Sequence, residues 1–185
     1  MRIVAGAYRG RTLVAPKGHS TRPTSDRARQ ALFNVLEHAP WARPWPDLRV
    51  LDGFAGSGAL GLEALSRGAG FCLLADSDPA ARAAIAANIA ALGCDDRARV
   101  VGFDMARLGP RGVEAPFDLV FLDPPYRSGL AEAALACLAS GDWLATGARV
   151  VVERGEGEAP LNAAGYARLD ERAWGKARVS FLARE

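Results

Sequence analysis

Residues 51–61 read LDGFAGSGALG, and this stretch indicates the fold class of the chain. Gly56, Gly58 and Gly61 have the spacing G-x-G-x-x-G, between a short apolar run over 49–52 and a helix-prone segment over 58–67. A loop of this kind between a strand and a helix brings the backbone close to a bound nucleotide-like ligand. The spacing therefore predicts a Rossmann-like loop for an adenosine-containing cofactor, without choosing between NAD and S-adenosylmethionine.

Acidic residues near the ends of the neighbouring predicted strands refine this prediction. Asp76 ends an apolar strand predicted over 71–76, where a carboxylate accepts hydrogen bonds from ribose hydroxyls. Asp52 precedes the glycine loop, and its charge would attract a cationic sulfonium and repel a pyrophosphate, which favours S-adenosylmethionine. Asp104 follows a third predicted strand, where it either accepts the adenine amino group or serves as a turn residue. The predicted cofactor-binding residues are Asp52, Gly56, Ser57, Gly58, Asp76 and Asp104.

Strand-like and helix-like segments alternate along the chain after residue 48. Such alternation is typical of a parallel, doubly wound sheet that binds ligands at the carboxyl ends of its strands. Two further strands, near 166–171 and 177–182, have no long helix between them, which predicts an antiparallel pair. We therefore predict an α/β domain with a Rossmann-like, mostly parallel seven-stranded sheet. Its other strands are predicted over 49–52, 71–76, 99–102, 117–122 and 148–153, and its helices over 58–67, 79–92 and 130–138.

The fourth predicted strand ends in Asp123-Pro124-Pro125-Tyr126, which carries the predicted chemistry. The amino group of a base is a poor nucleophile because its lone pair is delocalised into the ring. The Asp123 carboxylate and the Pro124 carbonyl can each accept one of its N–H hydrogen bonds, which orients the lone pair toward an incoming methyl group. Tyr126 can stack on an extruded base. We predict Asp123, Pro124 and Tyr126 as catalytic residues, with a rigid strand-ending turn as the alternative interpretation.

The N-terminal part of the chain is strongly basic. Residues 1–29 hold seven Lys or Arg and one acid, although the net charge of the whole chain is only +2. Two β-prone runs, 2–5 and 11–15, predict a short hairpin, and a helix is expected to about residue 37. A basic segment on a mildly acidic domain indicates a polyanionic partner, with a solvated basic surface as the alternative. We divide the chain into this extension, 1–46, and a methyltransferase core, 47–185.

The whole chain resembles the bacterial ribosomal RNA small-subunit methyltransferase D family. The resemblance implies a class I methyltransferase that transfers a methyl group from S-adenosylmethionine to the N2 amine of a guanine in 16S ribosomal RNA. It also implies that Arg22, Thr24 and Arg27 lie at the mouth of the active site, while Arg9 and Arg11 fit a basic platform for RNA phosphates. The matching stretches are 2–6, 9–11, 21–27, 31–34, 51–67, 123–126 and 174–176.

Composition argues against a membrane-spanning protein, a disulfide-stabilised protein and a metal-binding protein. Half the residues are apolar and 24% are charged, with no apolar run long enough to span a membrane and no apolar leader at the N-terminus. Cys72, Cys94 and Cys137 are odd in number and far apart, so we expect neither a disulfide framework nor a metal site. We therefore expect a cytoplasmic protein with no membrane partner, and we expect it to be a monomer. The family resemblance implies ribosomal RNA, within the small ribosomal subunit, as its partner.

Three alternatives remain open from the residues. An NAD-dependent oxidoreductase would use the same glycine loop, although about 60 residues after the fourth strand leave little for a substrate domain. A non-enzymatic RNA-binding module would keep the fold without the chemistry. A methyltransferase of the same class would act instead on a DNA adenine or a protein amide, although amide methyltransferases more typically carry Asn in place of Asp123.

Overall fold

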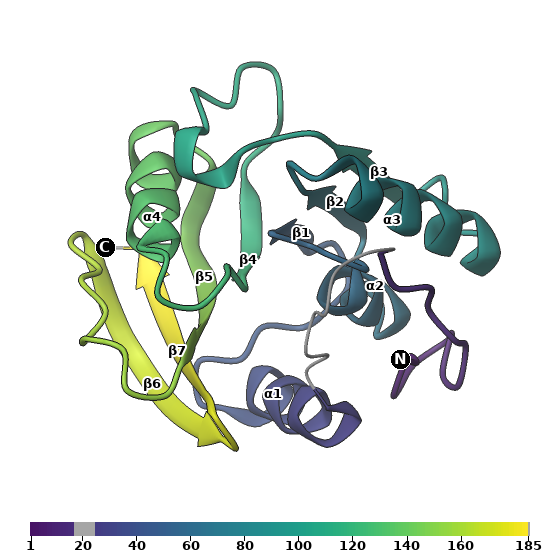
Figure 1. Ribbon diagram of the computed structural model, residues 1–185, viewed down its shortest axis with the longest axis horizontal. Helices are drawn as coiled ribbons and strands as arrows, with labels where there is room; N and C mark the ends of the chain where they lie inside the picture. The colour runs from purple at the N-terminus through teal and green to yellow at the C-terminus, as the bar shows by residue number, and fades with distance from the viewer. Residues whose placement is uncertain (17–24, 185) are drawn as a thin grey trace.

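A seven-stranded sheet lies at the centre of the structure, a computed structural model that describes residues 1–16 and 25–184 (Figure 1). In chain order the elements are α1 (Asp26–His38), β1 (Arg49–Gly53), α2 (Ala59–Ser66), β2 (Phe71–Ala75), α3 (Pro79–Leu92), β3 (Ala98–Val101), the 3₁₀ helix η1 (Met105–Arg107), β4 (Phe117–Leu122), α4 (Leu130–Ser140), β5 (Leu144–Gly155), β6 (Tyr166–Trp174) and β7 (Ala177–Arg184). The strand order is β3-β2-β1-β4-β5-β7-β6. The first five strands are parallel, and β7 is antiparallel to both of its neighbours. The predicted Rossmann-like, mostly parallel seven-stranded sheet is thereby confirmed.

Successive residues of the central strands point to opposite faces of the sheet, and each face buries its own apolar cluster. Val50 and Phe121 lie in the cluster that α1, α2 and α3 cover. Leu51 and Val120 lie in the second cluster, with η1 and α4. Burial on both faces explains why successive residues in the middle of these strands are apolar.

Local sequence chemistry accounts for where the helices begin and end. Asp78 caps α3 through its side chain, Pro79 occupies the first helical turn, and Gly93 ends the helix in a left-handed conformation with φ 64°. Ser25 caps α1 in the same way. None of the helices in the described ranges is both long and apolar enough to cross a membrane.

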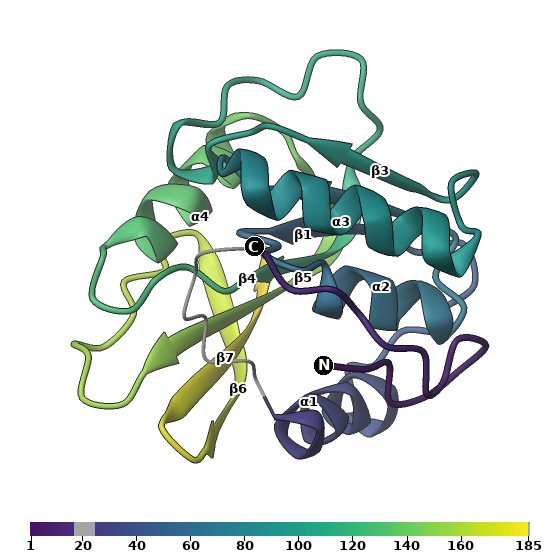
Figure 2. The ribbon, with the colours of Figure 1, turned by 45° about the vertical axis from the view of Figure 1, so that its right-hand side comes forward.

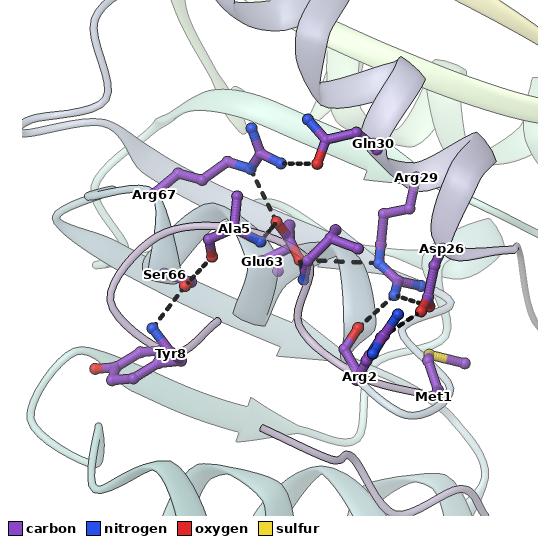
Figure 3. A network of polar contacts seen from close by, with 12 residues as sticks. Met1, Arg2, Ala5, Tyr8, Asp26, Arg29, Gln30, Glu63, Ser66 and Arg67 are labelled. Carbon is purple, nitrogen blue, oxygen red and sulfur yellow. Dashed lines mark hydrogen bonds and ion pairs between the residues drawn. The ribbon is translucent and has the colours of Figure 1, made fainter. Parts of the chain in front are cut away.

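The N-terminal arm, residues 1–16, runs beside α2 and α3 (Figure 2). The predicted hairpin is present but short: one antiparallel bridge joins Arg2 and Thr12, and beside it the Ile3 and Leu13 N–H groups donate to the Arg11 and Met1 carbonyls, both at 2.9 Å. It extends no further because Val4 and Ala5 donate their backbone N–H groups to the carboxylate of Glu63 on α2, at 2.8 and 3.0 Å, instead of to an opposing strand. Figure 3 shows Ala5 beside Glu63. The arm is therefore attached to the core through a side chain.

Two arginines balance the buried charge of Glu63. Arg67 Nε lies 2.9 Å from Glu63 Oε1, and Arg29 Nε lies 3.9 Å from Oε2 (Figure 3). Arg29 is itself buried, and it also donates to the backbone carbonyl of Arg2. One of the basic residues that suggested an exposed RNA-binding surface thus holds α1 and the N-terminal arm onto α2.

Candidate active site

The glycine loop, residues 54–58, leaves the carboxyl end of β1 and leads into α2. Gly56 and Gly58 both adopt left-handed conformations, with φ values of 57° and 77°, which favour glycine. A side chain at Gly58 would place its Cβ 2.8 Å from Leu74, whereas the space beside Gly56 is open. The loop therefore packs tightly against the sheet at Gly58 and leaves its backbone accessible at Gly56.

Asp76, directly after β2, shapes this loop. Its carboxylate accepts hydrogen bonds from the backbone N–H groups of Gly56 and Asp78, at 2.8 and 2.9 Å. Each carboxylate oxygen has a further lone pair, so both can still accept a hydrogen bond from a ligand hydroxyl. The residue predicted to bind ribose thus lies against the predicted glycine loop.

Asp52 is buried beneath the start of α2. Its Oδ2 accepts a hydrogen bond from the Gly61 backbone N–H at 2.8 Å. Burial raises the pKa of this carboxyl to about 7, the hydrogen bond from Gly61 opposes the rise, and the charge of Asp76 adds to it. A cation bound nearby would stabilise the ionised form of Asp52, which is the property expected of a residue beside a sulfonium.

Strand register brings the glycine loop beside the Asp123–Tyr126 tetrapeptide. In the pairing of β1 with β4, Gly53 lies opposite Leu122, so the loop and the tetrapeptide leave adjacent strands at the same level. On the other side of β4, Leu122 lies opposite Val152, so Asp123 and Glu153 follow directly on neighbouring parallel strands. Three segments with polar groups therefore meet at the carboxyl edge of the sheet.

Asp123 and Tyr126 lie in an acidic environment. Burial raises the pKa of Asp123 well above its ordinary range, and the negative charges of Glu153 and Asp52 raise it further. The Tyr126 hydroxyl donates to Glu153 Oε1 at 3.0 Å, and burial together with this carboxylate raises the pKa of the phenol. The Tyr126 ring lies against Gly155, where a Cβ would stand 2.9 Å from the ring. Tyr126 as a residue is about half exposed, so part of it is accessible to a ligand.

Glu153 is the candidate site residue that the sequence prediction missed. It is buried, it receives the Tyr126 hydroxyl, and it lines a hollow beside Pro124 and Pro125. The available signal was an acid at the end of an apolar strand, the same pattern that singled out Asp76. Because strand pairing cannot be deduced from this pattern, Glu153 could not be matched to Asp123.

The other two predicted cofactor-binding side chains, Asp104 and Ser57, make contacts that do not by themselves indicate a ligand. Asp104 caps η1 by accepting from the Ala106 N–H at 3.0 Å and its side chain is about half exposed, so its contact with adenine remains a prediction. Ser57 is nearly buried, and its hydroxyl points to the sulfur of Met1 at 3.5 Å.

The basic residues predicted to bind RNA are divided between exposed and undescribed positions. Arg9 and Arg27 are exposed, and Arg11 donates to the carbonyl of Ala91 at the end of α3. Arg22 and Thr24 lie outside the described residues. The three cysteines are free thiols, and within residues 1–16 and 25–184 no group of three or more His, Cys, Asp or Glu could hold a metal ion.

Comparisons with known proteins identify relatives that match most of the chain. The family model of Conserved hypothetical protein 95 matches residues 1–183. Ribosomal RNA small subunit methyltransferase D of Escherichia coli K12 is 43% identical over 155 residues, covering 83% of this chain and 74% of the relative. The protein of the same name from Haemophilus influenzae is 38% identical over 164 residues, covering 87% and 81%. The solved structure of Escherichia coli yhhF superposes with a TM-score of 0.83 at 38% identity, covering 100% of this chain and 98% of that one.

Proposed function

Because the chain belongs to the Conserved hypothetical protein 95 family, together with ribosomal RNA small subunit methyltransferase D, we propose that it methylates the exocyclic N2 amine of a guanine in small-subunit ribosomal RNA. The family expected from the sequence is confirmed. The observation that carries the proposal is the β1–β4 register, because it sets the glycine loop beside Asp123. A donor and an acceptor bound at these two segments would be neighbours.

The chain's residues fit S-adenosylmethionine as the donor. The open backbone at Gly56 and the spare lone pairs of Asp76 suit an adenosine with its ribose hydroxyls. Asp52, buried with a pKa near 7, suits a nearby positive charge. Ser57, Gly58 and Asp104 complete the proposed cofactor contacts. When bound, S-adenosylmethionine supplies an electrophilic methyl group on a sulfonium.

Asp123 and Pro124 orient the target amine in this proposal. The Asp123 carboxylate accepts one N–H of the amine and the Pro124 carbonyl the other, which directs the nitrogen lone pair out of the ring plane. The methylated nitrogen must lose one proton. Asp123 is suited to take it, because its raised pKa gives it a higher proton affinity than an ordinary aspartate.

Tyr126 stacks on the guanine that has been extruded for reaction. The hydrogen bond to Glu153 and the contact with Gly155 fix the ring before the base arrives. Such preorganisation lowers the ordering cost on binding. Arg9, Arg11 and Arg27, with Arg22 and Thr24, contact RNA phosphates and position the substrate without selecting its sequence.

The test is transfer of labelled methyl groups from S-adenosylmethionine to small ribosomal subunits that lack the modification, followed by nucleoside analysis. We expect label in N2-methylguanosine, and no label with Asp123→Ala. Label in another nucleoside would retain the chemistry and reject the guanine. Cofactor binding without label in ribosomal RNA would redirect the search to DNA adenine or protein amides, and no cofactor binding would refute the proposal.

A further inference from the structure

Asn88, on α3, joins the N-terminal arm to the glycine loop through a buried side-chain amide. It is 1% exposed. Its Oδ1 accepts the backbone N–H of Val14 at 2.8 Å, and its Nδ2 donates to the backbone carbonyl of Val14 at 3.0 Å. The same Nδ2 donates to the backbone carbonyl of Ser57 at 2.9 Å. One side chain thus bonds both backbone groups of an arm residue and one peptide of the loop.

The three bonds use both donor hydrogens and the acceptor oxygen of the Asn88 amide. Both Nδ2 hydrogens are engaged, one on the arm and one on the loop, and the oxygen is engaged on the arm. No other natural side chain of this length offers two donors and an acceptor on one planar group. Aspartate would keep the acceptor and lose both donors. The bridge therefore depends on the amide and not only on the volume of the residue.

Asn88 contacts the glycine loop and the N-terminal arm at positions where a movement of the loop would also move the arm. Ser57 lies between the two left-handed glycines of the loop, and its hydroxyl also touches Met1 of the arm at 3.5 Å. Val14 is two residues from the end of the described arm, before the segment that holds Arg22 and Thr24. A change in the Ser57 peptide must alter its bond to Asn88, and with it the support of Val14.

We propose that Asn88 is a positioning residue that couples the glycine loop to the N-terminal arm, so that cofactor binding at the loop orders the arm. The inference rests on the proposed function, in which the loop binds an adenosyl cofactor and the arm faces RNA. Asn88 touches neither ligand in this proposal. It acts by holding the Ser57 peptide and the Val14 backbone in one arrangement.

The test uses S-adenosylhomocysteine, which binds without reacting, and measures amide hydrogen exchange of the full chain. Calorimetry first establishes that the compound binds. In the wild-type protein we expect the bound compound to slow exchange of the Val14 amide by about 2- to 10-fold, the range that corresponds to one net hydrogen bond. Unchanged exchange at Val14 in a protein that binds the compound would overturn the inference and leave the proposed function intact. A protein that does not bind the compound loses both.

Variants at Asn88 separate coupling from simple loss of stability. Asn88→Ala and Asn88→Asp are expected to raise the dissociation constant of S-adenosylhomocysteine about 2- to 10-fold and to abolish its effect on Val14 exchange. Ile89→Ala is the control, because Ile89 is a buried apolar neighbour on the same helix, and its truncation destabilises the core without removing the bridge. A folded Asn88→Ala protein that still transmits protection to Val14 would also overturn the inference. If that variant does not fold, the wild-type measurement decides alone.

Discussion

Replacing Glu63 by Gln should lower stability more than any exposed charge change, because four groups depend on its carboxylate. Glu63 is 0% exposed, accepts the N–H groups of Val4 and Ala5, and is paired with Arg29 and Arg67. A glutamine offers one acceptor oxygen and turns an NH₂ group toward these donors. Arg67 would keep its ion pair with Glu37 and Arg29 its ion pair with Asp26, but both would lose the fully buried charge that lies between them.

The expected loss follows from measured costs of comparable changes. Removing one partner of a buried ion pair costs about 3–5 kcal/mol. For a chain of this size, 1 kcal/mol changes Tm by about 2–4 °C, so Glu63→Gln should lower Tm by about 6–20 °C. Exchange of at least one of the Val4 and Ala5 amides should also become faster, because glutamine keeps only one of the two acceptor oxygens.

The assay is thermal unfolding of the wild type and the variant, with Glu171→Gln as a matched control. Glu171, on the edge strand β6, pairs with Arg168 of the same strand and with Arg178 of β7. Both arginine side chains are about half exposed, and such pairs contribute less than about 1 kcal/mol. The control should therefore shift Tm by less than about 4 °C. Equal shifts for the two variants, with Val4 and Ala5 still protected, would refute the role assigned to Glu63.

Four further changes test the site. Asp123→Ala should reduce methyl transfer at least about 100-fold with little change in cofactor affinity, and normal turnover would reject the mechanism. Asp76→Ala should weaken S-adenosylmethionine about 10-fold or more, and an unchanged dissociation constant by calorimetry would rule out the ribose contact. Asp52→Asn should stabilise the protein at high pH. The folded pKa of Asp52, about 7, exceeds the unfolded value of about 3.9, so the wild-type fold loses stability as pH rises through this window. In urea unfolding, the free energy of unfolding of Asp52→Asn relative to the wild type should rise by up to about 4 kcal/mol between pH 4 and 8. A difference between the two proteins that does not change with pH would contradict the raised pKa of Asp52. Charge reversal at Arg9 and Arg27 should weaken RNA binding and make its salt dependence shallower by about one unit per lost phosphate contact, and an unaltered slope would exclude these contacts.

Several parts of the fold could be predicted because they depend on local chemistry. The apolar runs that became β1, β2 and β4, and the Asp78-Pro79 start and Gly93 end of α3, need no distant partner to be recognised. Boundaries shifted where tertiary pairing extends an element. β5 continues to Gly155, beyond the predicted end at residue 153, because Gly155 pairs with Ala177 of β7.

The sequence by itself determined the order of strands and helices along the chain, the glycine loop and the Asp123–Tyr126 tetrapeptide. Each of these is a pattern of residues that are close together in the sequence. The tertiary structure decided which acid faces Asp123, and that the N-terminal arm attaches through Glu63 and Asn88 instead of extending its short hairpin. The bonds from Val4 to Glu63 and from Val14 to Asn88 join residues 59 and 74 positions apart. Contacts at such separations depend on strand register and on the direction of individual side chains, and neither is encoded in local periodicity.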